Sequence, residues 1–179
     1  IKAIKEEDSS ATIILVEPLV KVHQNGLLSD EKLFEINEYQ FEAADMISGI
    51  ICPELGGSSD LFDILGVNYY WNCQWVEGGE TVYWPDPINA RIPLRKLLFA
   101  FYLRYEKPIF ISETGHFGEG RVEWLQEIGR ECEAVINAGI PFWGVCIYPV
   151  TDRPDWDNLL EYSNCGIFDL DTQGNRIPH

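Results

Sequence analysis

The sequence predicts an α/β fold in which helices cover a parallel sheet. Four short apolar segments, near residues 12–17, 63–70, 108–113 and 142–148, have the length and composition of buried strands. Amphipathic segments of helical length separate them, an alternation typical of βα units. Polar and aromatic residues gather where these strands end, as in the active site of a (β/α)₈ (TIM) barrel. Four units supply about half of such a barrel.

The first half of the chain contains two of these strands and one long amphipathic segment. Residues 1–8 have the pattern of the end of a helix, and residues 11–16 are a β-branched run. Residues 31–48 carry apolar side chains at roughly helical spacing, which predicts a helix. Residues 62–70 form a second buried strand with an aromatic end, and a long loop is expected between residues 71 and 92.

The second half contains two helices and two further strands. Residues 93–105 are expected to form a helix that begins with a proline. The strand at 108–113 ends on a carboxylate, Glu113, which directly follows a continuous apolar run. A strong helix is predicted over residues 121–137, and residues 142–148 read as the last buried strand.

Length and charge narrow the classes of function. A chain of 179 residues can form one domain with a sizeable core, so residues 1–179 are expected to be a single domain. The net charge of −16 disfavours binding to nucleic acid or to an anionic membrane. No glycine fingerprint follows the first strand, no P-loop motif is present, and no apolar run is long enough to span a bilayer.

The cysteine and histidine content predicts no metal site and no cofactor. Five cysteines occur at no metal-ligand spacing, mostly among apolar neighbours, so we expect buried, reduced thiols and a reducing compartment, the cytoplasm. The three histidines are scattered along the chain, which disfavours a metal-dependent barrel hydrolase. The chain opens on Ile1 and a charged segment, which suggests a piece of a longer protein, so a missing signal peptide excludes nothing.

Aromatic residues make up 13% of the chain, including six tryptophans and eight tyrosines. They have two interpretations: packing in the core, or platforms on which a flat apolar ligand such as a sugar ring stacks.

Several of these segments resemble family 1 β-glucosidases and their relatives in clan A. Residues 65–70 (Leu-Gly-Val-Asn-Tyr-Tyr) resemble the sixth barrel strand of that family. Residues 109–115 (Ile-Phe-Ile-Ser-Glu-Thr-Gly) resemble the seventh, where the glutamate of a Thr/Ser-Glu-x-Gly motif is the nucleophile. Residues 142–149 and the loop through Trp156 are similar to the eighth strand and its sugar-binding loop, and residues 166–169 to the segment after it. The likeness is greatest to a divergent bacterial β-glucosidase-like branch.

The resemblance implies a retaining glycosidase mechanism, in which one carboxylate attacks the anomeric carbon and a second protonates the leaving oxygen from about 5 Å away. Glu113 would be the nucleophile, and Tyr70 would hydrogen-bond to it and help keep it ionised. Other residues near the strand ends are candidates for sugar stacking or for contacts to hydroxyl groups. These substrate-binding candidates are Glu17, Asn68, Trp71, His116, Trp143, Tyr148, Asp152, Arg153 and Trp156.

Some of these residues also have a purely structural interpretation. Tyr70 suits the core as well as the site. Trp143 lies in a predicted buried strand and is better explained as a core residue. Asp152 and Arg153 are adjacent and suit a surface ion pair as well as a sugar contact.

The chain departs from the pattern of this family at the position of the acid/base residue. It should be a glutamate after an asparagine at the end of the fourth strand, and the available candidate is Glu17, which follows Val16. Between Glu17 and Asn68 there is room for one strong helix but for no further clear strand. Residues 11–16 are therefore better taken as the fifth strand, so that the chain supplies strands five to eight. The acid would then lie outside the chain, and Glu17 would be a substrate-side or structural carboxylate.

Two classes of function therefore stay open. In the first, the chain is the C-terminal half of a β-glucosidase-like hydrolase that acts on a carbohydrate. In the second, it is a catalytically incomplete or non-enzymatic fragment that acts as a carbohydrate-binding or assembly module. A half barrel leaves two strand edges and a sheet face open, so we expect a partner: the N-terminal half barrel or a second copy of the chain.

Overall fold

The computed structural model describes residues 1–85 and 91–179. Part of the predicted loop at 71–92, residues 86–90, lies outside the described residues. The elements in chain order are α1 (Lys2–Glu7), β1 (Ile14–Pro18), β2 (Lys21–His23), α2 (Asp30–Glu38), η1 (Tyr39–Phe41), α3 (Glu42–Ser48), η2 (Pro53–Leu55), β3 (Ile64–Asn68), β4 (Gln74–Val76), α4 (Leu94–Tyr105), β5 (Ile109–Thr114), η3 (Gly118–Gly120), α5 (Arg121–Asn137), β6 (Phe142–Ile147), β7 (Arg153–Pro154), β8 (Tyr162–Ser163), β9 (Phe168–Leu170) and β10 (Arg176–Pro178).

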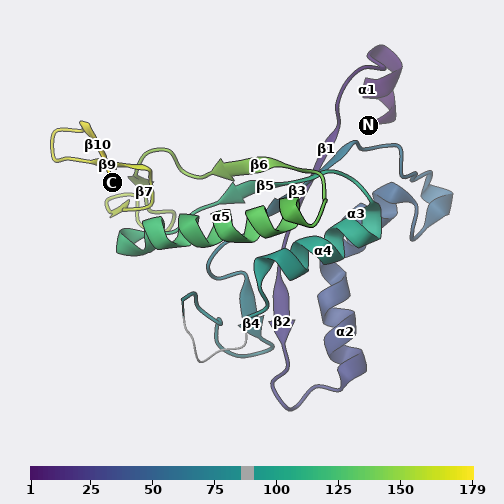
Figure 1. Cartoon of the computed structure of the whole chain (residues 1–179), viewed down its shortest axis with the longest axis horizontal. Helices are drawn as coiled ribbons and strands as arrows, with labels where there is room; N and C mark the ends of the chain where they lie inside the picture. The colour runs from purple at the N-terminus through teal and green to yellow at the C-terminus, as the bar shows by residue number, and fades with distance from the viewer. Residues whose placement is uncertain (86–90) are drawn as a thin grey trace.

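A four-stranded sheet in the order β1-β3-β5-β6 organises the chain, and all its neighbouring strands run parallel. Their carboxyl ends therefore lie at one edge of the sheet, where the short strands β7 to β10 also lie (Figure 1). The parallel α/β arrangement predicted from the sequence is confirmed, with all four predicted strands present. The sheet stays open rather than closing into a barrel, because β1 and β6 are its two edges.

The hydrophobic core fills the space between the two central strands and a layer of helices. Helices α3, α4 and α5 gather along one side of the sheet (Figure 1). Helix α5 presents apolar side chains at spacings of three or four residues, which places them on one helix face. The fully buried core residues of the central strands and of α4 and α5 include Leu65, Val67, Leu98, Phe101, Ile109, Ile111, Ile128 and Val135.

The edge strands differ from the sequence prediction. Residues 142–148 were expected to form a buried strand, yet Trp143 is 65% exposed and both Val145 and Ile147 are more than a third exposed. On β1, Ile14 and Val16 are also exposed. The predictions of a buried last strand and of Trp143 as a core residue are therefore wrong for this chain. An apolar run shows what a strand can bury, but not whether a covering layer is present.

The predicted helix at 31–48 is divided into α2, η1 and α3. Asn37, near the end of α2, bonds the main chain of β2 through both its amide nitrogen and its amide oxygen, each at 3.0 Å from an atom of Val22. The 3₁₀ turn that follows ends at Phe41, whose ring packs on Phe101 of α4 with 4.8 Å between centroids. Tertiary contacts thus override the helical periodicity at this point.

The cysteines are all free thiols, but the expectation that they are buried holds only in part. Cys132 is buried, Cys73 and Cys165 are half-buried, and Cys52 and Cys146 are exposed. Cys146 has apolar neighbours in the sequence, yet it lies on the open edge strand β6. Across the described residues, no helix combines the length and the apolar character needed to cross a membrane.

Candidate active site

A cavity of about 760 Å³ opens at the carboxyl edge of the sheet. Its lining comes from three parts of the chain: residues 70–72 after β3, Glu113 near the end of β5 with residues 115–118 after it, and part of residues 148–165 after β6. A volume of this size suits a small ligand, and the carboxyl ends of parallel strands are where such sites are found.

Glu113 and Tyr70 face each other in this cavity. Between β3 and β5 the register shifts by one residue, so that Val67 is opposite Ile111 while Asn68 is opposite Glu113. The backbone N–H of Tyr69 then donates to the carbonyl oxygen of Glu113 at 2.9 Å, which fixes both strand ends. Beyond this point, the Tyr70 hydroxyl donates a hydrogen bond to Oε1 of Glu113.

The Tyr70 phenol remains protonated at neutral pH. Burial raises its pKa above the ordinary tyrosine value, and the hydrogen bond to Glu113 raises it further. Tyr70 is therefore the donor in its hydrogen bond to the Glu113 carboxyl group. Hydrogen bonds to an ionised acceptor are among the stronger ones in proteins. No described residue donates to the other oxygen, Oε2.

Gly115 allows the segments after β5 and β6 to come together. A Cβ atom at this position would collide with the carbonyl oxygen of Tyr148, so the close approach requires glycine. A hydrogen bond also joins the two segments: the N–H of Tyr148 donates to the carbonyl oxygen of Thr114 at 2.9 Å. Tyr148 is thereby held on the wall of the same cavity as Tyr70.

An aromatic cluster forms another wall of the cavity. Trp71 stacks on Tyr83 with ring centroids 5.2 Å apart, and its other neighbours are Phe117 at 5.1 Å and His116 at 5.6 Å. His116 also packs against Trp84, at 5.5 Å. These contacts hold Trp71 and His116 in place at the cavity wall.

The loop after β6 supplies the third wall. The guanidinium carbon of Arg153 lies 4.6 Å from the ring centroid of Trp156 and 6.0 Å from that of Tyr148. Asp152 is buried beside them and accepts hydrogen bonds from the backbone N–H groups of Cys165 and Gly166, both at 3.0 Å. The Asp152 carboxylate thus closes the loop from within.

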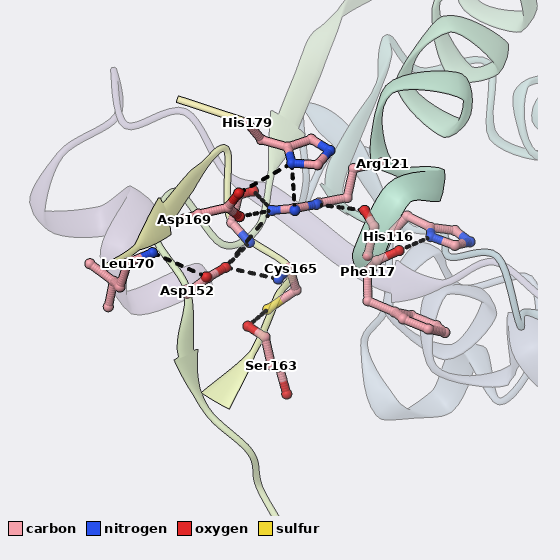
Figure 2. A network of polar contacts seen from close by, with 11 residues as sticks. His116, Phe117, Arg121, Asp152, Ser163, Cys165, Asp169, Leu170 and His179 are labelled. Atoms are coloured by element: carbon pink, nitrogen blue, oxygen red, sulfur yellow. Dashed lines mark hydrogen bonds and ion pairs between the residues drawn. The ribbon is translucent and has the colours of Figure 1, made fainter. Parts of the chain in front are cut away.

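Arg121, at the start of α5, joins this loop to the C-terminal hairpin (Figure 2). Its guanidinium donates to the carbonyl oxygen of Gly166, to Oδ1 of Asp169 and to Nδ1 of His179, each at 2.6 Å. The Asp152 carboxylate lies 3.9 Å away. The hydrogen bond from Arg121 lowers the pKa of Asp169 below its usual range. We call Arg121, Asp152, Asp169 and His179 the arginine hub.

Sequence reasoning missed most of the arginine hub. Arg121 and His179 carried no recognised signal, although an arginine in the first turn of an amphipathic helix is worth noting, because cations there oppose the helix dipole. Asp169 was noted only as part of a family-like segment. The cavity also includes Asn72, Phe117, Asp155 and Tyr162, which the sequence did not single out.

The structure brings seven of the predicted site residues together at the cavity and leaves four outside its lining. The cavity-lining residues are Tyr70, Trp71, Glu113, His116, Tyr148, Arg153 and Trp156, and the residues outside are Glu17, Asn68, Trp143 and Asp152.

The four outer residues have identifiable surroundings. Asn68 accepts a hydrogen bond from Ser112 at 2.8 Å, and half-burial raises the pKa of Glu17. Trp143 lies on the open strand β6. The alternative of a surface ion pair between Asp152 and Arg153 is wrong, because Asp152 is buried and bonds main-chain N–H groups instead. Among the described residues, no group of three or more His, Cys, Asp or Glu side chains suits a metal ion.

The sequence matches no protein-family model and no curated protein, but the fold matches solved structures. A β-glucosidase from Thermotoga maritima in complex with glucoimidazole superposes with a TM-score of 0.75 at 15% identity, over 99% of this chain and 50% of that one. The hyperthermophilic β-glucosidase from Pyrococcus furiosus gives 0.68 at 18% identity, over 95% and 40%. At such identities the likeness concerns the fold alone. The chain spans about half the length of these proteins and has the fold of that half.

Proposed function

We propose that this chain is the nucleophile-bearing half of a retaining glycoside hydrolase of the β-glucosidase type. The observation that carries the proposal is the hydrogen bond from Tyr70 to Glu113 at the wall of a ligand-sized cavity. The cavity lies at the carboxyl edge of a parallel sheet, and the fold likeness to β-glucosidases supports the same reading.

In the proposed reaction, Glu113 attacks the anomeric carbon and forms a covalent glycosyl-enzyme, which water then hydrolyses. The Tyr70 hydroxyl holds one carboxylate oxygen and leaves Oε2 to attack. Trp71 and Trp156 offer aromatic faces for the sugar ring, and His116 offers a polar edge. The residues of the chain therefore supply the nucleophile, its orientation and part of the sugar site.

The proton donor for the leaving group comes from outside the chain in this proposal. Asp155 is the other carboxylate on the described cavity wall, but its Oδ1 accepts the N–H groups of Asp157 at 2.8 Å and Asn158 at 3.2 Å. The hydrogen bond from Asp157 is the largest of the effects that lower the pKa of Asp155. A carboxyl group with a lowered pKa is ionised at neutral pH and is a poor general acid.

A completing partner follows from the same proposal. The apolar side chains exposed on β1 and β6 would pack against the N-terminal half of the barrel, or against a second copy of the chain. Only the first partner would bring an acid opposite Glu113, so an assembly of two copies is expected to be inactive.

Sedimentation velocity of the isolated chain at micromolar concentration tests the need for a partner. We expect association, and we expect Val145→Lys on β6 to weaken it by burying a charge in the contact. Leu103→Lys is the matched control, because Leu103 is exposed on α4, away from the sheet edges. A well-dispersed monomer that melts cooperatively would contradict the half-barrel proposal.

Covalent trapping tests the role of Glu113. In the assembled barrel, a 2-fluoro glycoside is expected to label Glu113, and Glu113→Gln, which is nearly isosteric, is expected to abolish turnover while leaving the fold intact. Glu123→Gln, an exposed glutamate on α5, serves as the control. Labelling of another residue, or turnover by Glu113→Gln, would refute the assignment.

A carbohydrate-binding or assembly module is the second candidate function. The observation that favours it is the engagement of Asp155 in loop hydrogen bonds, since this leaves Glu113 without a free carboxylate partner on the described cavity wall. Sugar binding without labelling of Glu113 in any assembly would support this candidate over the hydrolase.

A further inference from the structure

Arg153 is a cation on the cavity wall that lacks an anionic partner. Its Nη1 donates to the carbonyl oxygen of Pro154 at 2.7 Å, while its Nε is buried and has no acceptor among the described residues. None of the ion pairs among the described residues includes Arg153, although its charge is one of the smaller effects that lower the pKa of nearby Asp155. By contrast, the guanidinium of Arg104 pairs with Asp45 and Glu38.

A buried donor without an acceptor is unusual enough to need an explanation. Leaving such a group unpaired costs about 1–3 kcal/mol, and most buried polar side-chain atoms therefore have a partner. The chain has a net charge of −16, so acidic side chains that could have paired with Arg153 are abundant. Nε itself is closed to solvent, but Nη2 bonds no described residue and is not enclosed, so it is the donor of Arg153 that an anionic ligand in the cavity can reach.

The surroundings of Arg153 fix its guanidinium through ring contacts and through one donor, Nη1, which bonds the carbonyl oxygen of Pro154. The face of Trp156 lies 4.6 Å away and that of Tyr148 6.0 Å away, so cation–π contacts hold the charged plane. The backbone beside Arg153 is fixed by the buried Asp152, a member of the arginine hub, which accepts hydrogen bonds from main-chain N–H groups (Figure 2). A preorganised donor set of this kind loses little entropy on binding.

The other charges of the cavity restrict where an anion can be placed. Glu113 and Asp155 are the carboxylates of the described lining, and each has an oxygen that accepts hydrogen bonds from protein groups. Both would repel an anionic ligand, whereas Arg153 is the one lysine or arginine among the described lining residues. An oxyanion entering the cavity is therefore directed to Arg153, whose planar fork matches a carboxylate or a phosphate.

We propose that Arg153 binds an oxyanion carried by the sugar, so that the cavity selects glycosides of uronic acids or of sugar phosphates over neutral glycosides. The inference rests on the proposed function in taking a sugar as the ligand. It goes beyond that function by assigning the substrate a charge and one residue the role of reading it.

Ligand titrations of the purified chain, followed by tryptophan fluorescence, test this assignment. The probes are methyl β-glucoside as the neutral sugar, methyl β-glucuronide and glucose 6-phosphate as anionic sugars, and inorganic phosphate alone. We expect at least one anionic sugar to bind tenfold or more tightly than the neutral one, and more tightly than inorganic phosphate. The preference should weaken as the salt concentration rises.

Three variants assign the preference to one side chain. Arg153→Gln should abolish it, and Arg153→Lys should keep part of it. Arg130→Gln, on an exposed arginine of α5, removes the same charge elsewhere and should change nothing. The thermal midpoint of Arg153→Gln should equal or exceed that of the wild type, because the variant removes an unpaired buried donor.

Equal affinities for charged and neutral sugars, or a preference that persists in Arg153→Gln, would overturn the inference. If Arg153→Gln does not fold, the salt dependence of the wild type and the reduced preference of Arg153→Lys still decide. A preference that depends on Arg153 without labelling of Glu113 supports this inference and refutes the hydrolase. Labelling of Glu113 together with equal affinities does the reverse.

Discussion

The central strands β3 and β5 and the edge strands β1 and β6 have similar apolar sequences but opposite environments. Val67 and Ile111 on the central strands are fully buried, whereas Ile14 on β1 is 48% exposed and Trp143 on β6 is 65% exposed. The composition of a strand is therefore not what decides its burial here; the number of covering neighbours is. These exposed apolar edges are the basis of the proposed partner, which would cover them.

The largest expected effect comes from the same substitution on a central and on an edge strand. Ile111→Ala should lower the free energy of unfolding by about 3–4 kcal/mol, because it leaves a cavity in a closed core. Ile147→Ala on β6 should cost about 1 kcal/mol or less, since that side chain is already 36% exposed. Urea denaturation of the isolated chain measures both, and equal losses would show that the edge is as well packed as the centre.

The strand positions could be predicted from the sequence because each apolar run is short and bounded. Pro108 begins the run that becomes β5, and Glu113 lies at its carboxyl end. The exposure of residues 142–148 could not be predicted, because an apolar run does not show whether another layer of the fold covers it. The division of the helix at 31–48 escaped for a related reason, since it follows from contacts with Val22 and Phe101, which are distant in sequence.

The site could be predicted where a residue directly follows a strand, and not where its partners are distant. Tyr70 and Glu113 each come directly after or at the end of an apolar run, so a parallel sheet brings them to one edge. Asp152 was weighed as an ion pair with its neighbour Arg153, but its carboxylate binds N–H groups 13, 14 and 18 residues further along the chain. Nothing in the sequence near Asp152 specifies those partners.

The arginine hub offers the next comparison, because it holds the segments that follow the edge strand β6. Arg121→Gln should lower the free energy of unfolding by about 2–3 kcal/mol, as it leaves buried Asp152 and half-buried Asp169 without their cation. The matched control Arg130→Gln removes an exposed pair and should cost less than about 0.5 kcal/mol. Thermal melts of both variants check this, and similar midpoints would mean that the hub contributes no more than a surface ion pair.

A smaller effect is expected from removing one hydroxyl on either side of the cavity. Tyr70 follows the central strand β3. The Tyr70→Phe substitution should lower kcat/KM of the assembled enzyme about 10–100-fold, because it removes a hydrogen bond to a charged group. Tyr148 follows the edge strand β6, and its hydroxyl bonds no described residue. The Tyr148→Phe substitution is therefore expected to change kcat/KM less than about threefold. If Tyr70→Phe instead loses stability with unchanged kinetics, Tyr70 is a core residue rather than part of the site.

The smallest expected effect is a change in how stability depends on pH. Arg121, and then His179, lower the pKa of Asp169 in the folded chain below its value of about 3.9 in the unfolded chain. A group with a depressed folded pKa contributes stability that is fully present above the unfolded value and is lost as the pH falls through the folded value. The stability advantage of the wild type over Asp169→Asn should therefore be constant near neutrality and should shrink below about pH 4. Because the Asp169 side chain is 35% exposed, the effect is modest, and urea midpoints at several pH values will resolve it best. In an Arg121→Gln background the same comparison should show little pH dependence, since the main cause of the lowered pKa is gone. An unchanged pH dependence in that background would mean that Arg121 is not what holds the Asp169 carboxylate in its charged form.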